Sequence, residues 1–253
     1  MKVGLGILTC ERLDYLRQVT AGVSQHLRNY VDELVIYHDG PAPRNLMGAV
    51  DPLLKPVQFV PDEFTGVATG KNALMVHLLD RGCDVIFISE DDVVVQSPLA
   101  VAGYTLSMAA SGWGHLAFHA HGPANDGGPV EGAEFPPGVT YWPNYVGAWC
   151  CYTREALTVG GLMDGGFSEF CHFEHVEHTL RLAMKGFHPL PREWGCPLAA
   201  DATGSENWIA EIPGSIEDSV IANRPESTLR YRAAKRYWAE AHPDTYQLLW
   251  RLP

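Results

Sequence analysis

The first half of the chain alternates between short apolar runs and amphipathic stretches. Apolar runs of this length are typical of strands buried on both faces of a sheet. Between them, apolar residues at spacings of three and four predict helices that begin near Leu13 and Gly66. The alternation indicates βαβ units, so the predicted fold class is α/β, with a mostly parallel sheet flanked by helices. The predicted strands lie at residues 3–8, 33–38, 57–60, 85–88 and 93–95.

The second half of the chain has a weaker pattern. A helix is expected after Ser97 to about residue 110, a strand at 146–152 and a helix at 173–185 that ends at Gly186. Alternation of His115, His119 and His121 with other residues predicts a strand at 114–121. The loop at 125–138 is rich in Gly and Pro and long enough to be a lid or binding segment.

The C-terminal region divides into two parts. Residues 199–219 are rich in Gly, Ser and Asp and are predicted to be irregular, whereas residues 227–241 read as a basic, aromatic and amphipathic helix that packs across the domain. No repeat interrupts the chain, so one domain is expected over residues 1–253.

Composition and charge exclude several classes of protein. A hydrophobic content of 46% over 253 residues is typical of a globular domain, and no apolar run approaches the length of a membrane span. The net charge of −12 opposes binding to nucleic acid or to an anionic membrane. Six cysteines without a Cys-x-x-Cys pair form neither a disulfide framework nor a zinc knuckle, and no signal peptide is recognisable, so the expected location is the cytoplasm.

Three consecutive acids end the fourth apolar run. Glu90, Asp91 and Asp92 follow a strand that is predicted to be fully buried, and packing does not require carboxylates there. Adjacent carboxylates repel one another unless a cation compensates them, and hard oxygen ligands suit Mg²⁺ or Mn²⁺. The alternative is a solvated turn whose acids cap the helix near Ser97.

A second group of titratable residues occupies the start of the helix at 173–185. Glu174, Glu177, His178 and Arg181 share one face of it, with His175 on a neighbouring face. A Glu or His there, close to a metal-bound substrate, is suited to removing a proton from a hydroxyl. One alternative is a solvated face on which Glu177 and Arg181 form a surface pair. A zinc site at His175 and His178 is a weaker alternative, because no His-Glu-x-x-His pattern accompanies them.

Together these segments resemble nucleotide-sugar-dependent glycosyltransferases of the GT-A fold, especially the large family-2 group. The segment at 89–93, Ser-Glu-Asp-Asp-Val, is similar to the metal-binding Asp-x-Asp motif in its Glu-Asp-Asp form. The other similar segments are the turn Thr-Cys-Glu-Arg at 9–12, His-Asp-Gly at 38–40, Gly-Val-Ala-Thr-Gly-Lys-Asn at 66–72, the Gly-Ala strand that begins at 147, and Glu-His-Val-Glu-His-Thr-Leu-Arg at 174–181.

The resemblance implies a role for nine residues. Asp92 would bind the metal, and His175 or Glu174 would be the catalytic base. Two positions depart from the family pattern: Lys71 replaces an Arg, which keeps the charge but loses the planar fork, and His175 replaces the usual Asp. The residues implied to bind the donor are Thr9, Arg12, Asp39, Lys71, Glu90 and Asp91.

The implied activity is the transfer of a hexosyl or N-acetylhexosaminyl group from a nucleotide-diphosphate donor, most simply a UDP-sugar, to an acceptor hydroxyl. The reaction would depend on Mn²⁺ or Mg²⁺ and invert the anomeric centre, and the acceptor could be a glycan, a protein or a modified base. Residues 1–120 would form the nucleotide-sugar-binding half, 121–195 the acceptor and catalytic half, and 196–253 a variable extension. Trp142, Trp149 and Trp194 are either sugar-stacking platforms or core residues.

Other functions remain open at the level of sequence. A nucleotidyltransferase acting on a sugar phosphate could use the same sheet and acids, but the turn at 9–12 lacks the usual glycine-rich phosphate loop. A noncatalytic nucleotide-sugar-binding module would keep the fold without turnover. A hydrolase is a weaker alternative, because no second acid at a defined separation can be identified.

Overall fold

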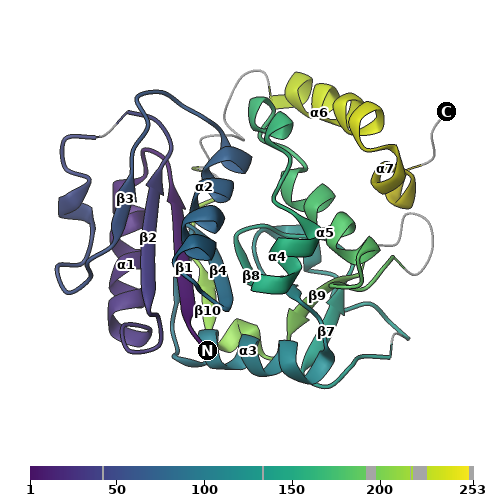
Figure 1. The fold of residues 1–253 in the computed structure, drawn as a ribbon, viewed down its shortest axis with the longest axis horizontal. Coiled ribbons are helices and arrows are strands. Elements are labelled where there is room, and N and C mark those ends of the chain that lie inside the picture. The colour runs from purple at the N-terminus through teal and green to yellow at the C-terminus, as the bar shows by residue number, and fades with distance from the viewer. Residues whose placement is uncertain (42, 133, 192–197, 217, 219–226, 251–253) are drawn as a thin grey trace.

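A six-stranded sheet lies at the centre of the molecule (Figure 1). The computed structural model describes residues 1–41, 43–132, 134–191, 198–216, 218 and 227–250. Four parallel strands come first in the sheet, and β8 runs antiparallel to β4 and β6, its two neighbours. The sheet order is β3 (Val57–Phe59), β2 (Glu33–His38), β1 (Val3–Thr9), β4 (Val85–Glu90), β8 (Trp149–Thr153) and β6 (His115–Ala117). The predicted α/β class with a mostly parallel sheet is confirmed.

Helices cover both faces of this sheet, which explains the continuous apolar run of β4. Phe87 belongs to a core shared with α1 (Leu13–His26) and α3 (Leu99–Ser111). Its neighbours Ile86 and Ile88 belong to the opposite core, which contains residues of α2 (Val67–Asp80), α4 (Arg154–Gly160) and α5 (Glu174–Met184). Successive side chains of one strand are therefore buried on opposite faces.

The C-terminal helices pack against the second half of the chain. A third apolar cluster contains Phe167 and Leu180 together with Trp238 of α6 (Ser227–Ala241) and Tyr246 of α7 (Pro243–Leu249). The predicted helix at 227–241 is thus confirmed. None of the helices in the described ranges combines the length and the apolar character that a bilayer span requires.

Two sequence predictions in the second half are wrong. The strand expected at 114–121 is confined to β6, because the chain beyond it turns His119 and His121 toward carboxylates. Residues 199–219 are not wholly irregular, since β9 (Ala199–Ala202) pairs with β7 (Val139–Trp142) and β10 (Ile209–Glu211) pairs with β5 (Val93–Val95). An Ala-Ala-Asp-Ala strand carries no local β signal, so tertiary pairing decides its conformation.

Candidate active site

The polar residues singled out in the sequence meet at one edge of the sheet. Strands β1, β2 and β4 are parallel neighbours, so the loops that follow them lie side by side beyond their carboxyl ends. The backbone N–H of Asp39 donates to the carbonyl of Thr9 at 2.8 Å, which joins two of these loops directly. The side chains form two clusters on either side of the end of β4.

The first, the acidic cluster, comprises Thr9, Arg12, Asp91, Asp92 and His121. Thr9 Oγ1 donates to Asp91 Oδ2 at 2.6 Å, and Arg12 Nη2 contacts Asp91 Oδ1 and donates to Asp92 Oδ2 at 3.2 Å. Asp91 is only 1% exposed, and burial raises the pKa of its carboxyl to about 7 although Arg12 acts in the opposite direction.

Asp92 also faces His121, whose Nε2 lies 3.4 Å from Asp92 Oδ2. Burial by itself would raise the pKa of Asp92, but His121 and Arg12 outweigh burial and lower it. Burial by itself would lower the pKa of His121, and the Asp92 carboxylate raises it instead. Asp92 therefore keeps its negative charge.

Asp92 and His121 together fit a divalent cation. Asp92 Oδ1 and His121 Nε2 are both buried, and neither has a hydrogen-bond partner among the described residues. No three His, Cys, Asp or Glu side chains in the described ranges form a metal site by themselves. One carboxylate and one imidazole would therefore need phosphate oxygens and water to complete the coordination, which is how Mg²⁺-type sites with few protein ligands are built.

The sequence interpretation did not include His121 in the site. The alternation of His115, His119 and His121 was visible, but it was interpreted as one face of a strand. The chain instead leaves the sheet after Ala117.

The second, the lysine cluster, comprises Lys71, Glu90, Gly147, Glu174 and His175. Lys71 is completely buried, and its Nζ donates to Glu90 Oε1 and, at 2.9 Å, to the carbonyl of Gly147. Burial by itself would lower the pKa of Lys71, but the carboxylates of Glu90 and Glu174 outweigh it and raise that pKa. The cluster thus contains a permanent buried ammonium between two carboxylates.

Glu174 and His175 begin α5 and are joined to each other. His175 Nδ1 lies 3.4 Å from Glu174 Oε1, and the imidazole packs over Gly147, where an added Cβ would come within 2.8 Å of His175 Cγ. Burial by itself would raise the pKa of Glu174, but His175 and Lys71 lower it to about 2. Glu174 is thus an ionised carboxylate next to an imidazole that is 24% exposed.

The remaining polar residues of α5 are structural. Glu177 is fully buried and makes two 3.0 Å hydrogen bonds with Arg181, so the expectation of a surface pair is wrong. His178 is buried, and its Nε2 bonds to the carbonyl of Gly161 at 2.9 Å. Among the residues that the structure describes, no group of three His, Cys, Asp or Glu side chains supports a zinc site with His175.

Asp39 organises the start of α2. Its carboxylate accepts hydrogen bonds from the backbone N–H and hydroxyl of Thr65 at 2.6 and 2.9 Å and from the N–H of Gly66 at 3.1 Å. The side chain is 8% exposed. The implied contact of Asp39 with the donor stays a prediction.

The three tryptophans differ in their surroundings. Trp149 is 1% exposed and packs against Phe87 in the core. Trp142 is half-buried and lines a cavity next to His119. Trp194 lies outside the described residues.

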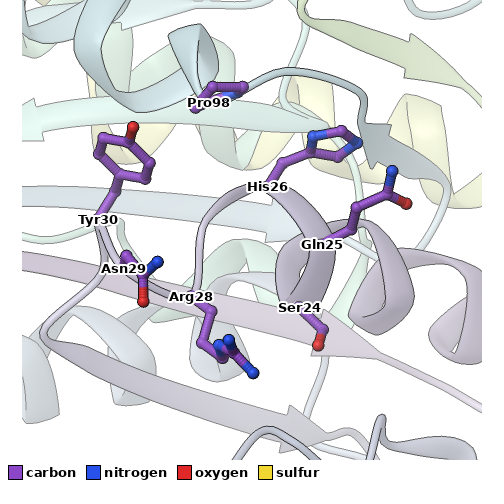
Figure 2. A pocket seen from close by; sticks show the side chains of 7 residues that line it. All are labelled: Ser24, Gln25, His26, Arg28, Asn29, Tyr30 and Pro98. Carbon is purple, nitrogen blue, oxygen red and sulfur yellow. The ribbon is translucent and has the colours of Figure 1, made fainter.

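A further cavity lies away from these clusters, at the C-terminal end of α1, and has a volume of about 280 Å³ (Figure 2). Arg12 of the acidic cluster precedes the other end of this helix, and 14 residues correspond to about 20 Å. The residues that line the cavity are Ser24, Gln25, His26, Arg28, Asn29, Tyr30 and Pro98, which include no carboxylate. It is therefore separate from the candidate active site.

Comparison with known proteins relates the chain by fold rather than by sequence. No protein-family model matches it, and no curated protein matches it in sequence. The mannosyltransferase PcManGT from Pyrobaculum calidifontis, solved with GDP-Man and Mn²⁺, superimposes with a TM-score of 0.59 at 13% identity over 98% of this chain and 67% of that chain.

Two other solved structures are similar to this chain in fold. Residues 1–349 of TarS from S. aureus give a TM-score of 0.57 at 11% identity, with 100% of this chain and 76% of that chain covered. GalNAc-T7, solved with UDP, GalNAc and Mn²⁺, gives 0.58 at 12% identity over 97% of this chain and 49% of that chain. The chain therefore has the GT-A fold of nucleotide-sugar glycosyltransferases, as the resemblance of its sequence segments implied.

Proposed function

We propose that the protein is a metal-dependent glycosyltransferase that moves a sugar from a nucleoside-diphosphate donor to an acceptor hydroxyl. The observation that carries the proposal is a pair of buried atoms without a hydrogen-bond partner among the described residues, Asp92 Oδ1 and His121 Nε2, beyond the carboxyl end of β4 in a GT-A fold. In this reading Asp92 and His121 hold Mn²⁺ or Mg²⁺. When bound, the cation would neutralise charge on the departing diphosphate as a Lewis acid.

The donor would lie along the edge formed by β1, β2 and β4. Thr9, Arg12 and Asp91 already form a hydrogen-bonded unit beside Asp92, which supports a role for Arg12 near the diphosphate. Asp39 would contact the nucleobase, and Lys71 would hold Glu90 toward the sugar. PcManGT was solved with GDP-Man and GalNAc-T7 with UDP, so sugars of both guanosine and uridine diphosphate should be tested as donors.

His175 is the better candidate for the catalytic base. The low pKa of Glu174, about 2, makes its carboxylate a weak base but a good acceptor for the Nδ1 proton of His175. That hydrogen bond would leave Nε2 to receive the proton of the acceptor hydroxyl. Attack by that hydroxyl opposite the leaving group would invert the anomeric centre.

The experiment measures release of nucleoside diphosphate from UDP-, GDP- and dTDP-sugars with Mn²⁺. One donor class is expected to turn over, and Asp92→Asn should lower its turnover by about 10³-fold or more, equivalent to about 4 kcal/mol. Direct Mn²⁺ binding, followed by electron paramagnetic resonance, should weaken about 10–100-fold in His121→Ala.

His26→Ala is the matched control, because His26 belongs to the separate cavity in Figure 2. It should bind Mn²⁺ and turn over donor like the parent. Undiminished Mn²⁺ binding in both Asp92→Asn and His121→Ala would refute the metal site. Donor binding without diphosphate release from any sugar would instead identify a noncatalytic binding module.

A further inference from the structure

A groove lies next to the chain segment that carries His121 of the acidic cluster. It consists of two adjoining cavities of about 580 and 230 Å³, which share Ala120, Gly122 and Asp126 as lining residues. Ala120 and Gly122 are the chain neighbours of His121, so the groove passes close to the candidate metal site. Cavities that hold small ligands are typically of this size.

The narrow end of the groove is built around His119. His119 is 9% exposed, and its Nδ1 lies 2.7 Å from the buried carboxylate of Asp201, which also accepts from the backbone N–H of His119 at 2.9 Å. Asp201 thereby fixes the proton on Nδ1. The other ring nitrogen, Nε2, has no hydrogen-bond partner in the described part of the chain.

An aromatic platform completes this end. The indole of Trp142 stacks on the His119 ring with centroids 3.5 Å apart and planes 5° apart. Trp142 is half-buried and lines the same cavity, so it contributes an aromatic wall to the groove. Aromatic rings of this kind bind the apolar faces of ligands that carry polar groups at their edges.

Carboxylates set the charge of the groove. Asp126 lines both cavities, and none of the described residues forms an ion pair with its side chain. Glu211 lines the larger cavity and accepts from the backbone N–H of Gly122 through Oε2 alone. Both side chains accept hydrogen bonds from hydroxyls or ammonium groups and repel anions.

The walls of the groove are held together by one amide. Asn125 Nδ2 donates to the carbonyls of His119 and Asn144 at 3.0 and 3.2 Å, and its Oδ1 accepts from the N–H of Asn144 at 3.0 Å. Asn144 lies three residues before Gly147, over which His175 packs. The groove is thus framed by the candidate metal site and by the chain segment that leads to the candidate base.

We infer that this groove binds the acceptor, and that the acceptor is an uncharged or amine-bearing saccharide rather than an acidic one. The sugar ring would lie against Trp142, and its hydroxyls would donate to Asp126, Glu211 and His119 Nε2. This inference rests on the proposed function, since it assigns the second substrate of that reaction.

The test measures saccharide binding directly, by saturation-transfer NMR on the full chain with UDP and Mn²⁺. The probes are chitobiose, its de-acetylated diamine and digalacturonic acid. The first two should bind and the acid should not. Trp142→Ala should weaken chitobiose binding about tenfold, equivalent to about 1.4 kcal/mol, and Trp142→Phe, which keeps a ring, should restore most of it.

Asp126→Lys should weaken binding of the diamine and allow the acid to bind. Asp80→Lys, at the exposed end of α2, is the matched control for the same change of charge and should behave like the parent. Equal binding of acidic and neutral probes, failure of both neutral and amino probes to bind, or unchanged binding in folded Trp142→Ala overturns the inference.

Release of nucleoside diphosphate is followed in the same samples. Diphosphate release without saccharide binding would overturn the acceptor groove and leave the transferase standing. Saccharide binding that responds to the variants, without release from any donor, would uphold the groove as a binding site and overturn the transferase.

Discussion

At the scale of single residues, the site depends on which atoms remain without partners. Lys71 is hydrogen-bonded to Glu90, and Asp91 is hydrogen-bonded to Thr9. In contrast, Asp92 Oδ1 and Glu174 Oε2 are buried and have no hydrogen-bond partner among the described residues. A buried oxygen without a partner costs about 1–3 kcal/mol. At the edge of the sheet, Asp92 Oδ1 and Glu174 Oε2 are therefore candidate contacts for a ligand.

The residue-scale prediction concerns His175 and Glu174. His175→Ala should lower kcat about 10²–10⁴-fold, the usual contribution of a general base, with a small change in donor KM. Glu174→Gln should lower kcat less, because the amide oxygen still orients the Nδ1 proton. The measurement is kcat and KM for the donor that the panel identifies. If both variants keep parental kcat, this end of α5 is structural.

The sequence pointed to most residues of the two clusters but not to their partners. The acids at 90–92 and the Glu-His pair at 174–175 stood out because local packing does not explain them. The pairing of Lys71 with Glu90 depends on how α2 lies against β4, and the approach of His121 to Asp92 depends on where β6 ends. Neither distance is encoded in the local pattern.

At the scale of elements, the start of α2 is held between the loop after β2 and the segment around Ser168. Asp39 holds Gly66 from one side, and the backbone N–H of Thr69 donates to Ser168 Oγ at 2.9 Å on the other. Gly66 has a φ of 86°, and an added Cβ would lie 2.3 Å from the carbonyl oxygen of Ser168. This glycine is required both by conformation and by close approach.

The element-scale prediction compares two glycines. Gly82 has a similar φ of 80°, but a Cβ there would meet nothing within 4 Å. Gly82→Ala should therefore lower the free energy of unfolding only by the cost of a positive φ in alanine, about 1–2 kcal/mol. Gly66→Ala should lower the free energy of unfolding by about 1–3 kcal/mol more than Gly82→Ala does, because backbone atoms of Ser168 must move. Urea unfolding measures both, and equal losses would contradict the close contact.

Long elements with strong periodicity were predictable, whereas several short ones were missed. The β1–α1–β2 and α2–β4 segments have clear patterns, whereas α4, β7 and α7 are only 7, 4 and 7 residues long. The Val-Thr-Tyr-Trp sequence of β7 is rich in β-forming side chains and offered a usable signal. β9 offered none.

At the scale of the whole molecule, buried histidines link stability to pH. His115, His178 and His188 lie in the interior, where burial lowers the pKa of His115 to about 4 and of His178 to about 3, and lowers that of His188 well below its usual value. These imidazoles stay neutral in the folded protein and take up protons on unfolding. Their contribution to stability is complete above pH 6.5 and is lost as the pH falls toward their folded pKa values.

The molecular-scale prediction follows from this proton balance. Between pH 6 and 4.5 the unfolded chain binds about three more protons at these histidines, while Asp91, with its pKa raised to about 7, holds one proton only when folded. The unfolded chain therefore binds about two protons more than the folded one, so the free energy of unfolding should fall by about 2–3 kcal/mol for each unit by which the pH is lowered. Urea titrations over this range, without added divalent cation, measure the slope.

His115→Phe supplies the control for this slope. It removes one of the three sites and should reduce the slope by about 1.4 kcal/mol per pH unit. A free energy of unfolding that is flat between pH 6 and 4.5 would contradict neutral interior histidines.

Contacts of residues 212–218 with earlier parts of the chain have a consequence for synthesis. Arg12 Nη1 donates to the carbonyl of Ser215 at 3.3 Å, Tyr15 Oη to Asp218 at 2.6 Å, and the N–H of Ile212 to the carbonyl of Asp92 at 2.8 Å. On the ribosome, the N-terminal strands can pair long before these partners emerge. The contacts around Arg12 and Asp92 form only after a segment translated some 200 residues after Arg12 has emerged. A nascent chain arrested before that segment would therefore carry a folded sheet with an incomplete candidate site.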